Sequence, residues 1–367
     1  MRRLATIRLV DEVFPIENAD RLEQVAIGGW RVVVGKGEFK KGDKIVYFEI
    51  DSALPVTDER YNFLKERCLK RWMNHGELIL ETIRIKSIKL RGVVSQGLVM
   101  PIMLFPELAL KFNVGDDVTE ALGVEHYDEL AEKCCRIQGV CKIAGNAKGN
   151  FPTHLLDKSD EERIQNLSEY FDGRFEEEEF EVTEKFDGSS ATYIYAPEIR
   201  PEDPFFVCSR NLELKEEEGN LYWDIAKKYD ILNKLKSFYE GTSVSGKTHV
   251  QIAIQGEIVG PGVNKNRDQY DVHEFRVFRI VDVDTRECFV PEAAYLASAM
   301  MKLPYVKVIK NRFKAFKELK TMEAFLEFVK GKTDRGHERE GMVFKSNRNG
   351  ELHFKVINND YLLKEKD

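Results

Sequence analysis

Residues 181–195, EVTEKFDGSSATYIY, place a lysine inside a run with the composition of a β-strand. Strand alternation puts Lys185 on the same face as Thr183 and Asp187, so the amine shares its side with a carboxylate. A lysine amine is protonated at neutral pH because its unperturbed pKa is about 10.4, and burial or a nearby cation would free it for nucleophilic attack. In a chain that is 32% charged, a solvated lysine is the simpler alternative.

The bulk composition favours two domains in an intracellular protein. A chain of 367 residues with 43% hydrophobic content can bury more than one core. The net charge of -7 argues against a globally basic nucleic-acid binder, so such a site would be a local patch. The six cysteines form no CxxC pair, and we find no export signal or apolar run of membrane-spanning length. We expect a soluble, intracellular monomer with no membrane partner.

The first part of the chain, through Pro106, consists of short strand patterns separated by Gly, Asn and Asp, which predicts a small β-barrel. Between Arg60 and Arg91 there are nine Lys or Arg against three Glu, and aromatic residues are interleaved with them (Tyr61, Phe63 and Trp72). This composition suits a nucleic-acid surface. A solvated basic helix and strand explains it equally well.

We place the domain boundary near Leu130, with a barrel and connector in residues 1–130 and a mixed α+β domain in residues 131–367. Residues 157–171 have a helical pattern, with Ser159 as N-cap and Glu162 as its capping-box partner. Residues 218–241 predict a second helix, and residues 321–331 a third. Strands are predicted at 249–262 and 274–283, and as a pair at 339–346 and 351–358.

One motif matches a phosphate-binding pattern but lies in the wrong sequence context. Residues 241–248, GTSVSGKT, fit the phosphate-binding pattern GxxxxGK[ST]. A P-loop needs a strand leading in and a helix leading out, so that the amides of the helix N-terminus face the phosphates. Here a helix pattern leads in and a strand pattern leads out, and we reject the motif.

Two glutamates next to glycine in strand patterns are candidates for holding a divalent metal beside Lys185. Glu257 lies in QGEIVG and Glu340 in REGMVFKS. Each could bind a hard cation directly or through its water shell. Taken alone, each is equally an ordinary surface glutamate.

In chain order, six motifs form a series: EKFDGSS, SRN, QGEIVG, FRVF, REGMVFK and HFKVIN. The series resembles the covalent nucleotidyltransferase superfamily of polynucleotide ligases and mRNA capping enzymes. Only twelve residues follow Lys355, too few for the trailing domain of capping enzymes and DNA ligases. The leading barrel and the stretch DEERIQN look like the RNA ligases typified by those of Deinococcus and Naegleria. This resemblance implies an N-terminal OB-type barrel followed by a mixed, mainly antiparallel nucleotidyltransferase domain.

The resemblance also implies residue roles. Lys185 would attack the α-phosphate of ATP and form lysyl-AMP. Mg²⁺ or Mn²⁺ would be held by Asp187, Glu257 and Glu340. Arg210 would grip the nucleotide and Lys355 its α-phosphate. The remaining residues that would bind the nucleotide are Glu184, Gly188, Ser190, Phe278, which would stack on adenine with Phe275 as its rival, and Lys345.

The chain departs from the family pattern at two places. Relatives often have an aspartate directly after the stacking aromatic, where this chain has Arg279. They also have a Lys-x-Lys pair where this chain offers only Lys355, with His353 or Ile357 in the second lysine's place. One cationic phosphate contact is therefore missing or supplied by Lys345.

The implied activity is that of an ATP-dependent RNA ligase, which seals a 3'-hydroxyl to a 5'-phosphate in a nicked, RNA-containing duplex. The first alternative is a catalytically inactive OB-containing RNA-binding protein, since the barrel also resembles tRNA-binding domains attached to synthetases. The intact acidic residues around Lys185 argue against it. The second is a GTP-dependent capping-type nucleotidyltransferase or a DNA ligase, and the domain order argues against both.

Overall fold

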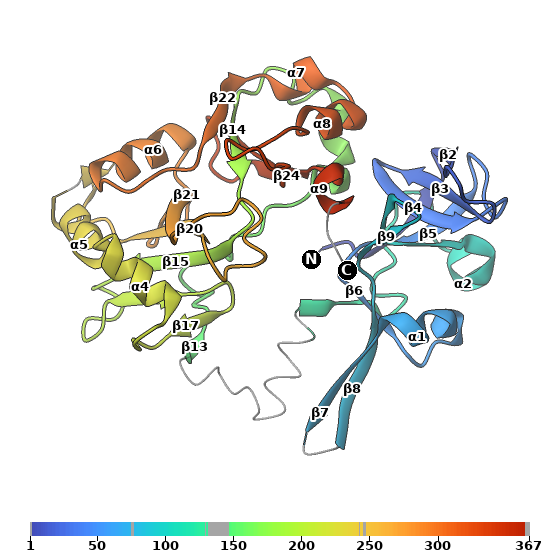
Figure 1. Ribbon diagram of the computed structural model, residues 1–367, viewed down its shortest axis with the longest axis horizontal. Helices are drawn as coiled ribbons and strands as arrows, with labels where there is room; N and C mark the ends of the chain where they lie inside the picture. The colour runs from blue at the N-terminus through green and yellow to red at the C-terminus, as the bar shows by residue number, and fades with distance from the viewer. Residues whose placement is uncertain are drawn as a thin grey trace. The chain divides into compact units, whose positions relative to one another are not determined.

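The computed structural model describes residues 2–74, 77–128, 130, 147–241, 243–244 and 247–363 (Figure 1). The chain divides into two compact units, one made of Met1–Lys142 with Leu362–Asp367 and the other of Ile143–Tyr361. The expected boundary at Leu130 adjoins residues 131–146, which lie outside the described residues, and it stays a prediction.

The first unit is built of short antiparallel strands, as predicted. Its three sheets of three or more strands have the orders β1-β5-β11, β2-β3-β4 and β12-β6-β8-β7, and β9 and β10 form a hairpin. The strands are β1 (Ala5–Leu9), β2 (Glu12–Pro15), β3 (Leu22–Ile27), β4 (Trp30–Gly35), β5 (Lys44–Phe48), β6 (Ser52–Pro55), β7 (Leu69–Asn74), β8 (Glu77–Arg84), β9 (Ser87–Leu90), β10 (Val93–Gln96), β11 (Leu98–Pro101) and β12 (Glu125–His126). The helices are η1 (Glu59–Leu64), α1 (Lys65–Cys68), η2 (Ile102–Leu104) and α2 (Pro106–Ala109).

Strand β5 connects the two hydrophobic cores of this unit. Val46 and Phe48 point into one core, whereas Ile45 and Tyr47 point into the other. Alternation thus buries both faces of this central strand. In Figure 1, β7 and β8 extend from the unit as a long hairpin that carries part of the basic segment Arg60–Arg91.

The second unit contains a six-stranded sheet, β13-β17-β16-β15-β20-β21, and a four-stranded sheet, β22-β14-β23-β24, in which all neighbouring strands are antiparallel. The strands are β13 (Ala147–Asn150), β14 (Phe180–Lys185), β15 (Ser189–Tyr195), β16 (Phe205–Cys208), β17 (Leu212–Leu214), β20 (Ile252–Val259), β21 (Glu274–Asp282), β22 (Val308–Phe313), β23 (Gly341–Ser346) and β24 (His353–Ile357). A small hairpin pairs β18 (Ser243–Val244) with β19 (Lys247–Thr248).

Helices cover one face of each sheet. The six-stranded sheet shares its core with α4 (Leu221–Lys228), α5 (Ile231–Gly241) and α6 (Pro291–Met300). The four-stranded sheet packs against α7 (Ala315–Leu319) and α8 (Met322–Phe328). Short helices η3 (Ile164–Asn166) and η4 (Ser168–Asp172) complete the unit, and α9 (Asn359–Leu363) begins at its end. Among the described residues, no helix is long and apolar enough to cross a membrane.

The helix predicted at residues 157–171 is wrong. The stretch is irregular up to Arg163 and then forms the two 3-10 helices η3 and η4. The backbone N–H of Lys355 donates to the carbonyl of Glu162 at 2.8 Å, so this segment pairs with β24 instead of with itself. The hydroxyl of Ser159 contacts Ser190 at 2.8 Å and does not cap a helix. Tertiary pairing has overridden local propensity.

The helix predicted at residues 218–241 is two helices. Asn220 caps α4 by accepting from the backbone N–H groups of Tyr222 and Trp223. Asp230 has a φ of 51°, in the left-handed region, and interrupts the helix between α4 and α5. Helix α5 then ends at Gly241, so a helix does lead into the rejected P-loop pattern, although residues 242, 245 and 246 of that pattern lie outside the described residues.

Candidate active site

Lys185 is the last residue of β14, and its amine contacts a carboxylate from the neighbouring strand. The Lys185 Nζ donates to Glu340 Oε1 at 2.7 Å. Glu340 directly precedes β23, whose first residue, Gly341, pairs with Lys185. A Cβ on Gly341 would lie 2.2 Å from the carbonyl oxygen of Val356, so glycine is needed for β23 and β24 to approach here.

The carboxylates around Lys185 keep its amine protonated. Burial lowers the pKa of Lys185, but Glu340 and Glu257 outweigh burial and raise that pKa above its ordinary value. Burial also raises the pKa of Glu257 to about 8; Lys185 opposes this shift, and Glu340 adds to it. The expected lowering of the lysine pKa by burial alone is therefore not seen. A cation beside the carboxylates would be needed to produce it.

The glycine of the EKFDGSS motif is required by packing. Gly188 lies against β20, where a Cβ would come within 2.3 Å of the Ile258 carbonyl oxygen and 2.7 Å of the Glu257 Cγ. A side chain here would displace either the loop or Glu257. Ser190, on β15, pairs in register with Glu257.

The three acidic residues predicted to hold a metal do not form a direct ligand set. Glu340 Oε2 is buried and has no hydrogen-bond partner. Asp187 accepts from Asn264 Nδ2 at 3.0 Å and from the hydroxyl of Tyr361. In the part of the chain that the structure describes, no group of three or more His, Cys, Asp or Glu side chains is placed to enclose an ion directly. Ligation partly through water, as Mg²⁺ prefers, suits this arrangement.

Arg210 and Lys355 are brought together by a residue that we did not predict. Lys355 Nζ donates to Asp160 Oδ1 at 2.6 Å, and Arg210 donates to Asp160 Oδ2 at 3.1 Å. Burial lowers the pKa of Lys355, the charge of Lys185 lowers it further, and Asp160 opposes the shift. One carboxylate thus holds both of the cations predicted to contact the nucleotide.

The structure separates the two aromatic candidates. The β21 strand has an irregular register opposite Gln255 and Gly256, and Phe278 is the extra residue of this bulge. Phe278 is only partly buried, beside Tyr305. Phe275 is fully buried in the core, where its ring packs across Gly256. Phe278 is therefore the aromatic with a free surface.

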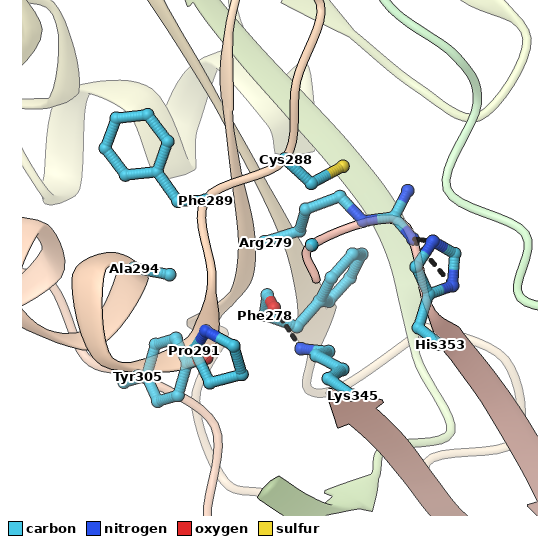
Figure 2. Close-up of a pocket in the computed structure, with 10 residues that line it drawn as sticks. Phe278, Arg279, Cys288, Phe289, Pro291, Ala294, Tyr305, Lys345 and His353 are labelled. Carbon is cyan, nitrogen blue, oxygen red and sulfur yellow. Dashed lines mark hydrogen bonds between the residues drawn. The ribbon is translucent and has the colours of Figure 1, made fainter. Parts of the chain in front are cut away.

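Lys345 lies behind Phe278. Its Nζ donates to the carbonyl oxygen of Phe278, and burial lowers its pKa to about 8, with Glu181 opposing (Figure 2). Lys345 pairs in register with His353. His353 and Lys355 are two residues apart on β24 and therefore lie on the same face of the strand.

The structure does not bring Glu184 into this cluster. Glu184 lies on the opposite face of β14 from Lys185, and its Oε2 is 3.7 Å from Lys307 Nζ and 3.8 Å from Arg339 Nε. Its own backbone N–H donates to the Lys307 carbonyl. These contacts suit a structural ion pair at the edge of the sheet.

Sequence reasoning missed four residues that line the cluster. Asp160 and Glu161 fell inside the wrongly predicted helix, although the stretch DEERIQN was noted for its resemblance. Asn264 and Tyr361 carried no signal, because a single amide or phenol in a loop or terminal helix has no recognisable spacing.

Comparison with known proteins identifies both parts of the chain. A family model for an OB-fold domain matches residues 4–102, and one for RNA ligase matches residues 178–357. Together they define a ligase with an OB-fold domain in front of its catalytic domain. A search of curated proteins finds no match.

Solved structures support the same assignment over the whole chain. Naegleria gruberi RNA ligase with PPi is 33% identical, with 100% of each chain covered and a TM-score of 0.75. A mutant of that ligase with AMP and Mn is 32% identical, with 99% of each chain covered and a TM-score of 0.75. Another mutant, with ATP and Mn, is 33% identical at full coverage and a TM-score of 0.75. This chain belongs to the RNA ligase family.

Proposed function

We propose that the protein is an ATP-dependent RNA ligase that joins a 3'-hydroxyl to a 5'-phosphate at a nick. The observation that carries this proposal is the placement of Lys185, at the end of β14 and hydrogen-bonded to Glu340, inside the region matched to RNA ligases. The AMP, ATP, PPi and Mn in the structures of the Naegleria enzyme support ATP and a divalent metal as the partners of this site.

In the first step, the neutral amine of Lys185 attacks the α-phosphorus of ATP. A nitrogen–phosphorus bond forms, the bond to the leaving pyrophosphate breaks, and the amine loses one proton to solvent. Lys355 and Arg210 stabilise the charge on the phosphate oxygens, while Phe278 stacks on the base. A Mg²⁺ or Mn²⁺ ion held by Asp187, Glu257 and Glu340 would supply the positive charge that lowers the pKa of Lys185.

In the next steps, the 5'-phosphate of the polynucleotide takes AMP from Lys185, and the 3'-hydroxyl then attacks the activated phosphate and releases AMP. Both are phosphoryl transfers, which depend on alignment more than on acid–base groups. Residues 1–130 would hold the duplex through phosphate contacts from the barrel, and residues 131–367 would carry the chemistry. The exposed side chains of Arg67 and Lys70 belong to the basic segment that suits this role.

Sealing of a nicked duplex tests this function. Wild-type protein with ATP and Mg²⁺ or Mn²⁺ should join a labelled 5'-phosphate strand to an RNA strand that ends in a 3'-hydroxyl. Lys185→Ala should fail on this substrate but seal one whose 5' end already carries AMP, because only the first two steps need the lysine. A wild-type protein that binds the duplex but seals neither substrate would support the inactive binding protein instead.

A further inference from the structure

Arg279 connects three separate segments around the candidate nucleotide site. It follows Phe278 on β21, and the residue is only 7% exposed. Its guanidinium donates to Glu161 Oε1 at 3.2 Å and to Gln255 Oε1 at 3.4 Å. It also lies 3.1 Å from Nε2 and 3.4 Å from Nδ1 of His353, as Figure 2 shows.

The segments around Arg279 carry, or directly contact, residues proposed to bind the nucleotide. Phe278 is the neighbour of Arg279 in the chain, and Lys355 lies two residues beyond His353 on the same face of β24. Glu161 follows Asp160, which holds both Lys355 and Arg210. A shift of the Arg279 guanidinium would therefore move the stacking ring and the phosphate contacts relative to each other.

The charges in this cluster are balanced. Burial would raise the pKa of Glu161, but Arg279, followed by Lys355 and His353, lowers it to about 2, so this carboxylate stays ionised. Burial and the charge of Arg279 lower the pKa of His353 to about 4, so its ring is neutral, and the guanidinium lies against it. His353 therefore does not replace a phosphate-binding lysine.

We propose that Arg279 is a positioning residue for ATP binding, and that Arg279 and His353 form one coupled exchange. By the resemblance described above, relatives often have an aspartate at the position of Arg279 and a second lysine at the position of His353 or of Ile357. The structure puts the side chains of Arg279 and His353 in contact. The guanidinium of Arg279 therefore takes the place of a carboxylate, and the neutral imidazole of His353 takes the place of an ammonium. The inference rests on the proposed function, since it concerns the same ATP site.

A charge exchange tests the coupling. Arg279→Asp alone places a second carboxylate beside that of Glu161, with no cation from His353 to balance them. His353→Lys alone places an ammonium against the guanidinium of Arg279, so that two positive charges repel each other. Each should raise the Kd for ATP at least about tenfold, whereas the double variant should return to within about threefold of wild type. Equilibrium ATP binding is measured in a Lys185→Met background, so that no chemistry follows binding. Arg312→Asp, at an exposed position on β22, is the matched control.

The outcomes separate this inference from the proposed function. An unchanged Kd for ATP in Arg279→Asp would overturn the coupling. So would a double variant whose fold-increase in Kd equals the product of the two single fold-increases. Absence of ATP binding in the Lys185→Met parent and in wild type would contradict the proposed function, and the positioning role with it. Should Arg279→Asp not fold, Arg279→Gln keeps a polar side chain of smaller size without the charge and should still raise the Kd. At saturating ATP, the rate of Lys185 adenylylation in otherwise wild-type protein should change less than the Kd does.

Discussion

At the scale of single residues, the site places acidic groups against the cations it needs. Lys185 contacts Glu340, and both Lys355 and Arg210 contact Asp160. The carboxylates of Glu340 and Glu257 raise the pKa of Lys185. If Lys185 is the nucleophile, as proposed, its amine must lose this proton before it attacks, and a cation beside the carboxylates would favour that loss.

Asp160 should compete with the phosphates of ATP. Asp160→Asn removes the negative charge that occupies Lys355 and Arg210, so the Kd for ATP should fall by about fivefold, or about 1 kcal/mol for this partly exposed carboxylate. Isothermal titration with ATP measures this, and Asp203→Asn, an exposed carboxylate paired with Lys148, is the control. Weaker ATP binding in Asp160→Asn would show that the carboxylate orients the cations and does not compete.

At the scale of elements, alternation along β21 determines which aromatic residue is available. Phe275 points into the core, whereas Phe278 lies on the other face and is only partly buried. Side chains from Glu274 to Arg279 alternate between partly buried and buried, so alternation alone puts the two rings on opposite faces of the strand. The sequence motif favoured Phe278, and Phe278 is the ring that the core does not enclose.

Alanine substitutions should separate the two rings. Phe278→Ala should weaken ATP binding by about 1–3 kcal/mol through lost stacking, with little change in the melting temperature. Phe275→Ala should cost about 3–5 kcal/mol of folding stability because it leaves a cavity beside Gly256. Denaturant titration and ATP binding on both variants check this. The assignment fails if Phe278→Ala is the variant that unfolds and retains its affinity for ATP.

The sequence predicted the parts of the site that lie on regular strands. Lys185, Glu257 and the β23–β24 pair follow from alternation and motif spacing, and the structure places them accordingly. Residues 157–171 were predicted as a helix because their local pattern is helical. Their backbone instead pairs with β24 some 190 residues later in the chain. Such a contact between distant segments leaves no periodic trace, which is why Asp160 and Glu161 were missed.

At the scale of the whole molecule, the chain divides into two compact units to which the proposed function assigns different roles. The first unit matches an OB-fold domain and carries the basic hairpin β7–β8, while the second contains every residue of the candidate site. Under the proposed function, the three chemical steps would depend on the second unit, and holding the polynucleotide would depend on the first. Changes in the first unit and changes in the second unit should therefore affect different steps of the reaction.

Deleting residues up to Leu130 should spare the first step and weaken the last. The truncated protein should still attach AMP to Lys185, because no site residue is removed, but it should seal a nicked duplex far more slowly than the full chain. Circular dichroism establishes that the truncated protein is folded. Sealing by the truncated protein at the rate of the full chain would refute a substrate-holding role for the barrel.

The most direct measurement is transfer of label from α-labelled ATP to the protein, resolved on a denaturing gel with Mg²⁺ or Mn²⁺ present. Wild-type protein should retain the label covalently, and Lys185→Ala should not, while α-labelled GTP should give no adduct in either. Label on Lys185→Ala would place the nucleophile elsewhere. No label on wild type with any metal, or label from GTP alone, would contradict an ATP-dependent ligase that works through lysyl-AMP.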